Sequence, residues 1–383
     1  MAHPVSWIGA PSEGGLRLPS GTPSPMSLYA PRGVWTDGLR LVVSDTGNHR
    51  VLIWHRLPTK DHQPADVVLG QGSFVEEGAN SRGTKLGMNL PTGVMVVEGR
   101  LVVADAWNHR LLVWDGVPEV SGEAPEYQIG QSDWDGCEMN AGGACSRTSL
   151  YWPFGVGVAG GRFWVADTGN RRALCWPGLP VPGQPPEMVL GQPDFVSNEE
   201  NRGEVGPASF RWVHAIAEAG GMQYFADAGN HRVLVWQKDT FSSAVAALGQ
   251  ESFDATYEWA YGPQSERVLR FPYAVAGDGD ILAVADTANN RVLIWDAAPA
   301  GMGHPADRVI GQDDFRAYGE NHWKEVTHSS MCWPYGLSLA GNLLAVADSG
   351  NNRVMLWSVE RETPALQAAG EPGGTGSAQL LGG

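Results

Sequence analysis

Six pairs of an aspartate and an arginine, spaced five residues apart, are the most regular polar feature of the sequence. A carboxylate beside a guanidinium could carry out acid-base chemistry, but catalysis uses one or two placed groups and not six equivalent ones. Bidentate bonds between such groups can instead pin a tight turn. We therefore predict a structural role for all six. The pairs are Asp45/Arg50, Asp105/Arg110, Asp167/Arg172, Asp227/Arg232, Asp286/Arg291 and Asp348/Arg353.

Three histidines, His49, His109 and His231, directly precede the arginine of their pair. Neutral imidazole is the commonest metal ligand in proteins. However, all ligands of one ion must lie near 2 Å from it, and three separate repeats would hold these rings far apart. We therefore predict that they too are structural. In the other three repeats the position is held by Arg171, Asn290 and Asn352.

Two connecting segments combine thiols with imidazole or thioether groups, which are ligand types for copper(I) or zinc. The segments enter the third and sixth repeats, so a shared site would require both to fold over the centre. We expect no cofactor, and keep a divalent or copper ion as the alternative. A local Cys137–Cys145 disulfide and ordinary thiols are the other interpretations. The candidate metal ligands are Cys137, Cys145, His322, His328 and Cys332.

The pairs belong to a repeat of about 60 residues, because the aspartates recur at steps of 60, 62, 60, 59 and 62. A marker proline lies 14 residues before each aspartate and is replaced only once, by Val213. Five repeats are followed by Gly-Gln-x-x-aromatic. Each repeat holds four short segments rich in β-branched and aromatic residues, too closely spaced for crossover helices. This pattern predicts an all-β, six-bladed β-propeller with four antiparallel strands per blade and long loops on one face.

The repeats predict a single domain over residues 1–383, with residues 371–383 as a flexible tail. Two segments compete for the outer strand of the sixth blade. Residues 5–9 and residues 365–370 both have the spacing that this strand requires. The segment left over would cap an edge or pair with a second chain, so we expect a monomer or a dimer formed through the terminal strands.

The core Ala-Asp-(Thr/Ala/Ser)-Gly-Asn-(His/Asn)-Arg-Val-Leu-x-Trp, preceded by Pro-x-Gly-Val, resembles the NHL repeat. The resemblance covers residues 31 to about 370 and implies a six-bladed propeller. Bacterial members of the family that also carry the Gly-Gln-x-x-Phe tail look most similar. The resemblance implies no particular activity.

Positions at which the repeats differ are the best candidates for function, because symmetric positions hold the fold. The residues on either side of the marker proline begin the innermost strand, so they should gather near the mouth of the central channel. We expect a binding surface there, centred on blades 3 to 6, and the alternative is that these rings form a core beneath the loops. Trp107 joins them because it occupies a turn that holds Gly or Ala in the other blades. The candidates are Arg32, Trp107, Trp152, Phe154, Trp212, His214, Tyr273, Trp333 and Tyr335.

Charge and composition restrict the partners. Acidic residues outnumber basic ones 42 to 26, which gives a net charge of −16 and disfavours nucleic acid and anionic membranes. No basic leader or long apolar run is visible, so we expect a cytoplasmic protein. We predict a binding scaffold that presents an aromatic, acidic loop face to a protein or small-ligand partner. The alternative is a metal-dependent hydrolase or lyase at the channel mouth, although the inner strands show no set of histidines or carboxylates for it.

Overall fold

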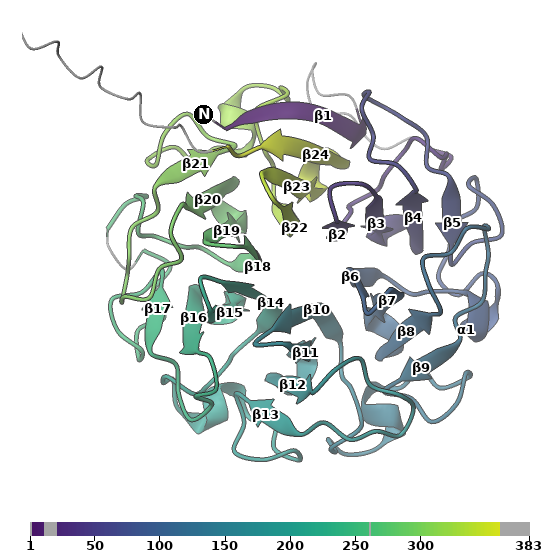
Figure 1. The fold of residues 1–383 in the computed structure, drawn as a ribbon, viewed down its shortest axis with the longest axis horizontal. Helices are drawn as coiled ribbons and strands as arrows, with labels where there is room; N and C mark the ends of the chain where they lie inside the picture. Colours follow the sequence, from purple (N-terminus) through teal and green to yellow (C-terminus); the bar gives the residue numbers. More distant parts are fainter. Residues whose placement is uncertain (1, 11–20, 260–261, 361–383) are drawn as a thin grey trace, which may run out of the picture.

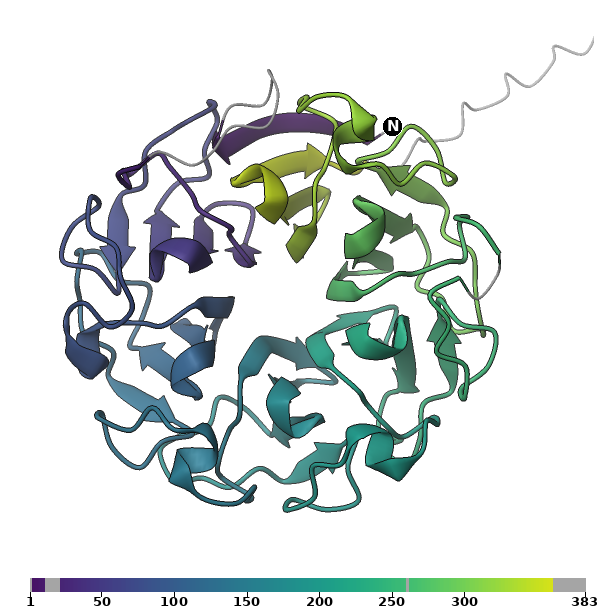
Figure 2. The same cartoon turned by 180° about the vertical axis from the view of Figure 1, so that it is seen from behind.

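The computed structural model describes residues 2–10, 21–259 and 262–360. Six four-stranded antiparallel sheets follow one another around a central channel (Figure 1). The prediction of a six-bladed propeller with four strands per blade is therefore confirmed. Short helical turns follow the aspartates and lie on one face of the disc, which Figure 2 shows toward the viewer. We call this the loop face.

The strands occupy equivalent places in every blade. The innermost strands, in blade order, are β2 (Gly33–Thr36), β6 (Pro91–Val97), β10 (Pro153–Ala159), β14 (Val213–Ala219), β18 (Pro272–Asp278) and β22 (Pro334–Ala340). The second strands are β3 (Leu41–Asp45), β7 (Arg100–Asp105), β11 (Arg162–Asp167), β15 (Met222–Asp227), β19 (Ile281–Asp286) and β23 (Leu343–Asp348). The third strands are β4 (Arg50–Trp54), β8 (Arg110–Trp114), β12 (Arg172–Trp176), β16 (Arg232–Gln237), β20 (Arg291–Trp295) and β24 (Arg353–Ser358). The outer strands are β5 (Val67–Leu69), β9 (Tyr127–Ile129), β13 (Met188–Leu190), β17 (Ala246–Leu248), β21 (Arg308–Ile310) and, in blade 6, β1 (His3–Gly9).

The few helical segments lie in turns and loops. Six 3-10 turns follow the marker aspartates: η1 (Thr46–Asn48), η2 (Ala106–Asn108), η4 (Thr168–Asn170), η6 (Ala228–Asn230), η7 (Thr287–Asn289) and η9 (Ser349–Asn351). The connections between blades hold α1 (Gly83–Leu86), η3 (Met139–Gly142), η5 (Glu200–Gly203) and η8 (Glu320–Trp323).

The N-terminal segment closes the ring. β1 pairs antiparallel with β24, from His3 opposite Ser358 to Gly9 opposite Arg353, and the two strands lie side by side at the rim (Figure 1). Ile8 of β1 is only 1% exposed. Residues 5–9 thus take the place for which residues 365–370 also competed. Residues 365–370 and the predicted tail 371–383 lie outside the described residues.

The Asp–Arg pairs hold the turns between second and third strands, as blade 4 illustrates. Asp227 Oδ2 accepts hydrogen bonds from Arg232 Nε at 2.9 Å and Asn230 Nδ2 at 2.7 Å, while its Oδ1 accepts one from the Arg211 N–H. The guanidinium also donates to the carbonyls of Gly206 and Ser209 in the preceding connection. All six pairs are fully buried, with N–O distances of 2.7 to 2.9 Å. This is the structural role that their repetition predicts.

The turn histidines link neighbouring blades. His231 Nδ1 accepts a hydrogen bond at 3.2 Å from the backbone N–H of Phe271, the residue before the marker proline of blade 5. His49 and His109 make the same bond, and Asn290 and Asn352 make it through their side-chain oxygens. An arginine has no acceptor. At Arg171 the bond is missing, and the Trp212 N–H of blade 4 turns to Asp227 Oδ1 at 3.2 Å instead.

This bond makes the fold sensitive to acid. Burial lowers the pKa of His231 to about 4, whereas an imidazole in an unfolded chain titrates near 6.5. Between these values the unfolded state binds the proton and the folded state does not, so stability falls as pH drops through this window. We expect His231→Asn, which keeps an acceptor but cannot titrate, to reduce the loss of unfolding free energy between pH 7.5 and 4.5 by about 2 to 3 kcal/mol. Denaturant titrations at both pH values measure the difference, and equal losses in variant and wild type would contradict it.

Candidate functional site

The residues that follow the marker prolines line the central channel and close it. Going around the ring, the centroid of Phe154 lies 4.3 Å from that of His214, which lies 4.5 Å from Tyr273, which lies 4.6 Å from Tyr335. The guanidinium of Arg32 then covers the Tyr335 ring at 4.8 Å. The cavity that these side chains leave measures about 60 Å³. The channel mouth is therefore filled by aromatic side chains packed edge to face or tilted against one another, and holds little open space.

His214 sits in the middle of this ring and is only 1% exposed. Its Nδ1 donates a hydrogen bond to the Trp212 carbonyl at 2.9 Å, while its buried Nε2 has no partner among the described residues. Burial, reinforced by the charge of Arg32, lowers the pKa of His214 to about 3, so the imidazole is neutral. A general base needs access to substrate. The surroundings of His214 favour the core alternative over a catalytic role.

The residues before the marker prolines form a separate group. In five blades, Trp212 of blade 4 being the exception, they have φ angles between 45° and 52°. Trp152 stays near the channel, with its ring 6.1 Å from His214, and Trp212 lies under the Arg211 guanidinium at 5.0 Å. Trp333 reaches away from the channel, where its Nε1 donates to Glu320 Oε1 at 2.9 Å. The expected single cluster is thus divided into a channel ring and an outer set.

A pocket of about 280 Å³ opens beside Trp333, between blades 5 and 6. We call it the aromatic pocket, and it is lined mainly by Phe271, Tyr273, Tyr318, Trp323 and Trp333, with Arg270 and Glu320. Trp323, in η8, is 71% exposed, and its ring centroid lies 6.0 Å from that of Tyr318. In the loop from Tyr318 to Cys332 the sequence suggests only candidate metal ligands. The signal for this pocket is the pair of aromatic residues Tyr318 and Trp323 in the same loop.

The two charged residues that line the aromatic pocket differ in their partners, because Arg270 has an ion-pair partner and Glu320 has a hydrogen-bond donor. Arg270 is paired with Glu258 at 2.9 Å and lies 4.9 Å from the centre of the Trp259 ring. Glu320 lines the pocket, and among the described residues its carboxylate accepts a hydrogen bond only from the indole N–H of Trp333. Aromatic faces beside a carboxylate attract cationic or amphipathic groups.

The candidate metal ligands of the alternative interpretation do not lie together. His322 Nδ1 is 3.3 Å from Asp313 Oδ1, and within the described residues no group of three or more histidine, cysteine or acidic side chains could hold an ion. Cys137 and Cys145 are free, so the disulfide alternative is wrong. Burial raises the pKa of Cys332 to about 12, which keeps it a thiol. His328 belongs to the same loop and joins no such group. The expectation of no cofactor stays a prediction.

Trp107, the remaining candidate, lies apart from both clusters. It is 52% exposed in η2 of blade 2, and its backbone N–H donates to the Asn89 carbonyl at 3.1 Å. Its neighbours therefore do not cover it.

Across the described ranges, no helix is long and apolar enough to cross a membrane.

Comparisons with known proteins point to one family. No protein-family model matches the chain. NHL repeat-containing protein 2 of Gallus gallus is 27% identical over 379 residues, and that of Homo sapiens is 26% identical over 382 residues. Each alignment covers 90% of this chain and 49% of the relative, so the chain spans about half the length of these curated relatives. Both are vertebrate proteins, and the closeness to bacterial members with the Gly-Gln-x-x-Phe tail stays a prediction.

Two solved structures are similar to this chain at low sequence identity. Virginiamycin B lyase from Staphylococcus aureus is 9% identical with a TM-score of 0.43, covering 86% of this chain and 94% of the lyase. A streptogramin B lyase is 10% identical with a TM-score of 0.44, covering 90% and 96%. Likeness at this level says nothing about activity. Six repeats in six blades make this chain a six-bladed β-propeller, and over 90% of its length it is similar to the NHL repeat-containing proteins.

Proposed function

We propose that the protein is a binding scaffold that holds a protein or small-ligand partner on its loop face, with the aromatic pocket as the anchor point. The observation that carries this proposal is the exposure of Trp323 beside Tyr318 and Trp333 around a hollow of about 280 Å³. Large aromatic side chains are costly to leave in water, and Trp and Tyr dominate the energetics of interfaces. The rigid ring of blades would hold the pocket in one shape for its partner.

The chemistry of the pocket and of the whole chain agree on the kind of partner. Glu320 in the pocket and the net charge of −16 favour a partner that is neutral or basic at the contact, and disfavour nucleic acid or an anionic membrane. We include a cytoplasmic location in the proposal, and a monomer, since β1 is used within its own ring. Nothing in the described part of the chain adds support to the metal-dependent hydrolase or lyase.

Affinity capture with three versions of the chain tests the proposal. We expect proteins or ligands that bind the wild type to be lost at least tenfold from a Trp323→Ala/Trp333→Ala variant, because each aromatic anchor contributes about 2 kcal/mol or more. Trp107→Ala is the matched control, since it removes an exposed tryptophan far from the pocket, and it should capture the same set as the wild type. Melting curves verify that all three are folded. Identical captured sets from the double variant and the wild type would refute the pocket as the anchor.

A further inference from the structure

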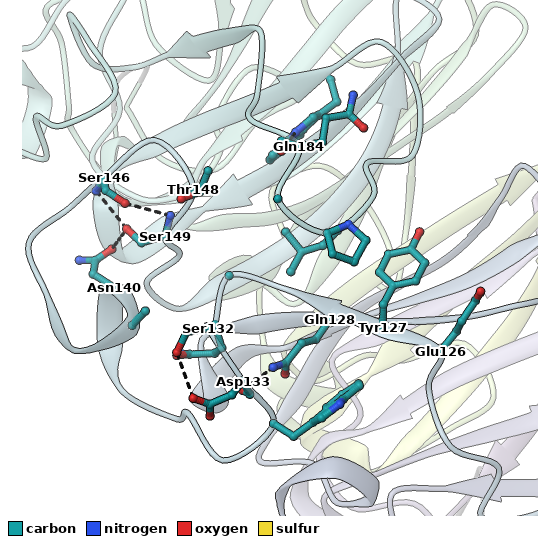
Figure 3. Close-up of a pocket in the computed structure, with 18 residues that line it drawn as sticks. Glu126, Tyr127, Gln128, Ser132, Asp133, Asn140, Ser146, Thr148, Ser149 and Gln184 are labelled. Atoms are coloured by element: carbon teal, nitrogen blue, oxygen red, sulfur yellow. Dashed lines mark hydrogen bonds between the residues drawn. The ribbon is translucent and has the colours of Figure 1, made fainter.

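A groove of about 810 Å³ lies in the outer rim between blades 2 and 3 (Figure 3), away from the loop-face pocket. Strand β9 and the turn after it form one wall, where Figure 3 shows Tyr127, Gln128 and Asp133. The outer loop of blade 3, which includes Gln184, and the segment from Ser146 to Ser149 form the other parts of the lining.

In three places around the ring, the outer loop of one blade covers the outer strand of the blade before it. The Gly122 N–H of blade 2 donates to the Val68 carbonyl of β5 at 2.8 Å, and the Val68 N–H donates to Ser121 Oγ at 3.1 Å. Blade 1 covers β1 in the same way, through His62 and Asp61 on the backbone of Trp7, and Gly303 of blade 5 donates to the Ala247 carbonyl of β17. The strand edge is thereby satisfied within the molecule.

At β9 this cover is missing. Gln128 is the equivalent of Val68, since it lies opposite Leu112 as Val68 lies opposite Leu52. No described residue hydrogen-bonds to the outward backbone N–H and C=O of Gln128, and Gly183 donates its N–H to no described residue. Gly183 has a positive φ of 81°, close to the 73° of Gly122, but Pro182 stands where blade 2 has Ser121.

The loop of blade 3 also falls short by one residue. Gly183 follows the third-strand tryptophan of its blade by seven residues, whereas Gly122 follows its tryptophan by eight. In addition, the Tyr127 hydroxyl donates to the Pro180 carbonyl at 3.1 Å, which places a phenol ring between the strand and the loop. These differences leave a strand edge exposed inside a groove. No described residue covers the edge of β13 either. The blade 4 loop next to β13 is three residues shorter than the corresponding loop of blade 2.

The side chains restrict what could lie in the groove. The side chain of Gln128 is held by Arg110, whose guanidinium donates to its Oε1 at 2.9 Å, so only its backbone is available to a partner. Tyr127, Trp134 and Trp176 supply apolar surface. Glu126 and Asp133 line the groove, and no lysine, arginine or histidine is among its lining residues. Arg100 lies 3.8 Å from Glu126 at the edge of the groove, and Asp133 Oδ1 accepts hydrogen bonds from the backbone N–H groups of Asp135 and Gly136. The groove therefore suits an apolar chain that carries a positive charge.

We propose that this groove binds an extended peptide segment of a partner protein, with an apolar residue and a neighbouring lysine or arginine, which adds to the edge of β9. The peptide backbone would bond the N–H and C=O of Gln128, as the loop of blade 2 bonds Val68. Addition of a strand to an exposed sheet edge gains affinity from backbone bonds and specificity from alternate side chains. This site is independent of the aromatic pocket.

The probe for this proposal is a phage-displayed library of random ten-residue linear peptides, selected on the full chain. We expect enriched peptides to carry a lysine or arginine beside an apolar residue. A synthetic copy of an enriched peptide should slow hydrogen exchange of the Gln128 amide. A closed variant, in which residues 117–122 of blade 2 replace residues 179–183 of blade 3, adds the missing residue and the serine and places the glycine eight residues after Trp176. It should bind the peptide at least tenfold more weakly while melting no lower than the wild type.

Two further variants separate the outcomes. Glu126→Gln should weaken binding several-fold, whereas Trp323→Ala should leave it unchanged. The proposal is overturned if the selection yields no binder, if enriched peptides bind the closed variant as tightly as the wild type, or if Trp323→Ala alone abolishes binding. A concentration-dependent dimer that the closed variant no longer forms would identify a second copy as the occupant and overturn the peptide proposal. Should the closed variant not fold, Gln128→Pro, which removes the outward N–H, replaces it in the same comparison.

Discussion

Asp227→Ala will lower the free energy of unfolding by about 3 to 5 kcal/mol, because it leaves the buried guanidinium of Arg232 without its anion. The carboxylate also accepts bonds from Asn230 and from the Arg211 backbone, and all of these donors lose their partner at once. Denaturant unfolding followed by tryptophan fluorescence measures the change.

The matched control for this prediction is an exposed pair in the neighbouring blade. Arg162 and Glu187 lie 3.0 Å apart at the surface, so Glu187→Ala should cost no more than about 1 kcal/mol. Binding to still-folded Asp227→Ala molecules should be unaffected. A stable Asp227→Ala protein that has lost its partner would move the pair from structure to function.

Ile8→Ala will cost about 2 to 5 kcal/mol, since it opens a cavity where β1 packs against the core of the ring. Val5 lies on the same strand, at the irregularity in its pairing with β24, and is 56% exposed. Val5→Ala removes two methyl groups from the same strand without a cavity, so it should change stability by less than about 0.5 kcal/mol. Equal melting temperatures for Ile8→Ala and the wild type would mean that β1 is dispensable for closure.

Much of the fold could be predicted because the same pattern of residues occurs in six repeats. The Asp–Arg spacing, the marker proline and the alternating apolar runs together determine the blades and their four strands. The same repetition could not decide which terminus closes the ring, because residues 5–9 and 365–370 both fit by spacing. That choice depends on packing, and Ile8 makes the difference visible only in three dimensions.

The candidate site was harder to predict because exposure is not a property of a repeat position. His214 and Trp333 each lie next to the marker position of their blade, held by Val213 and Pro334, yet one is buried in the channel and the other is 37% exposed. The rim groove depends on one missing residue and on Pro182, which matter only once the bond from Gly122 to Val68 is known. The missing residue and Pro182 are visible in the sequence, but their effect on the strand edge can be recognised only from how the loop aligns with the neighbouring strand.

Closure by β1 also determines when the ring can close during synthesis. The two strands that complete blade 6 are separated by nearly the whole described chain, since Gly9 lies opposite Arg353. At a synthesis rate of roughly 5 to 20 residues per second, the first strand waits on the order of 20 to 70 seconds before its partner exists. During that interval an apolar strand edge stays open to other chains. The first few residues are thus the last to reach their place, and a nascent chain depends on protection of this one short segment until the final blade has been made.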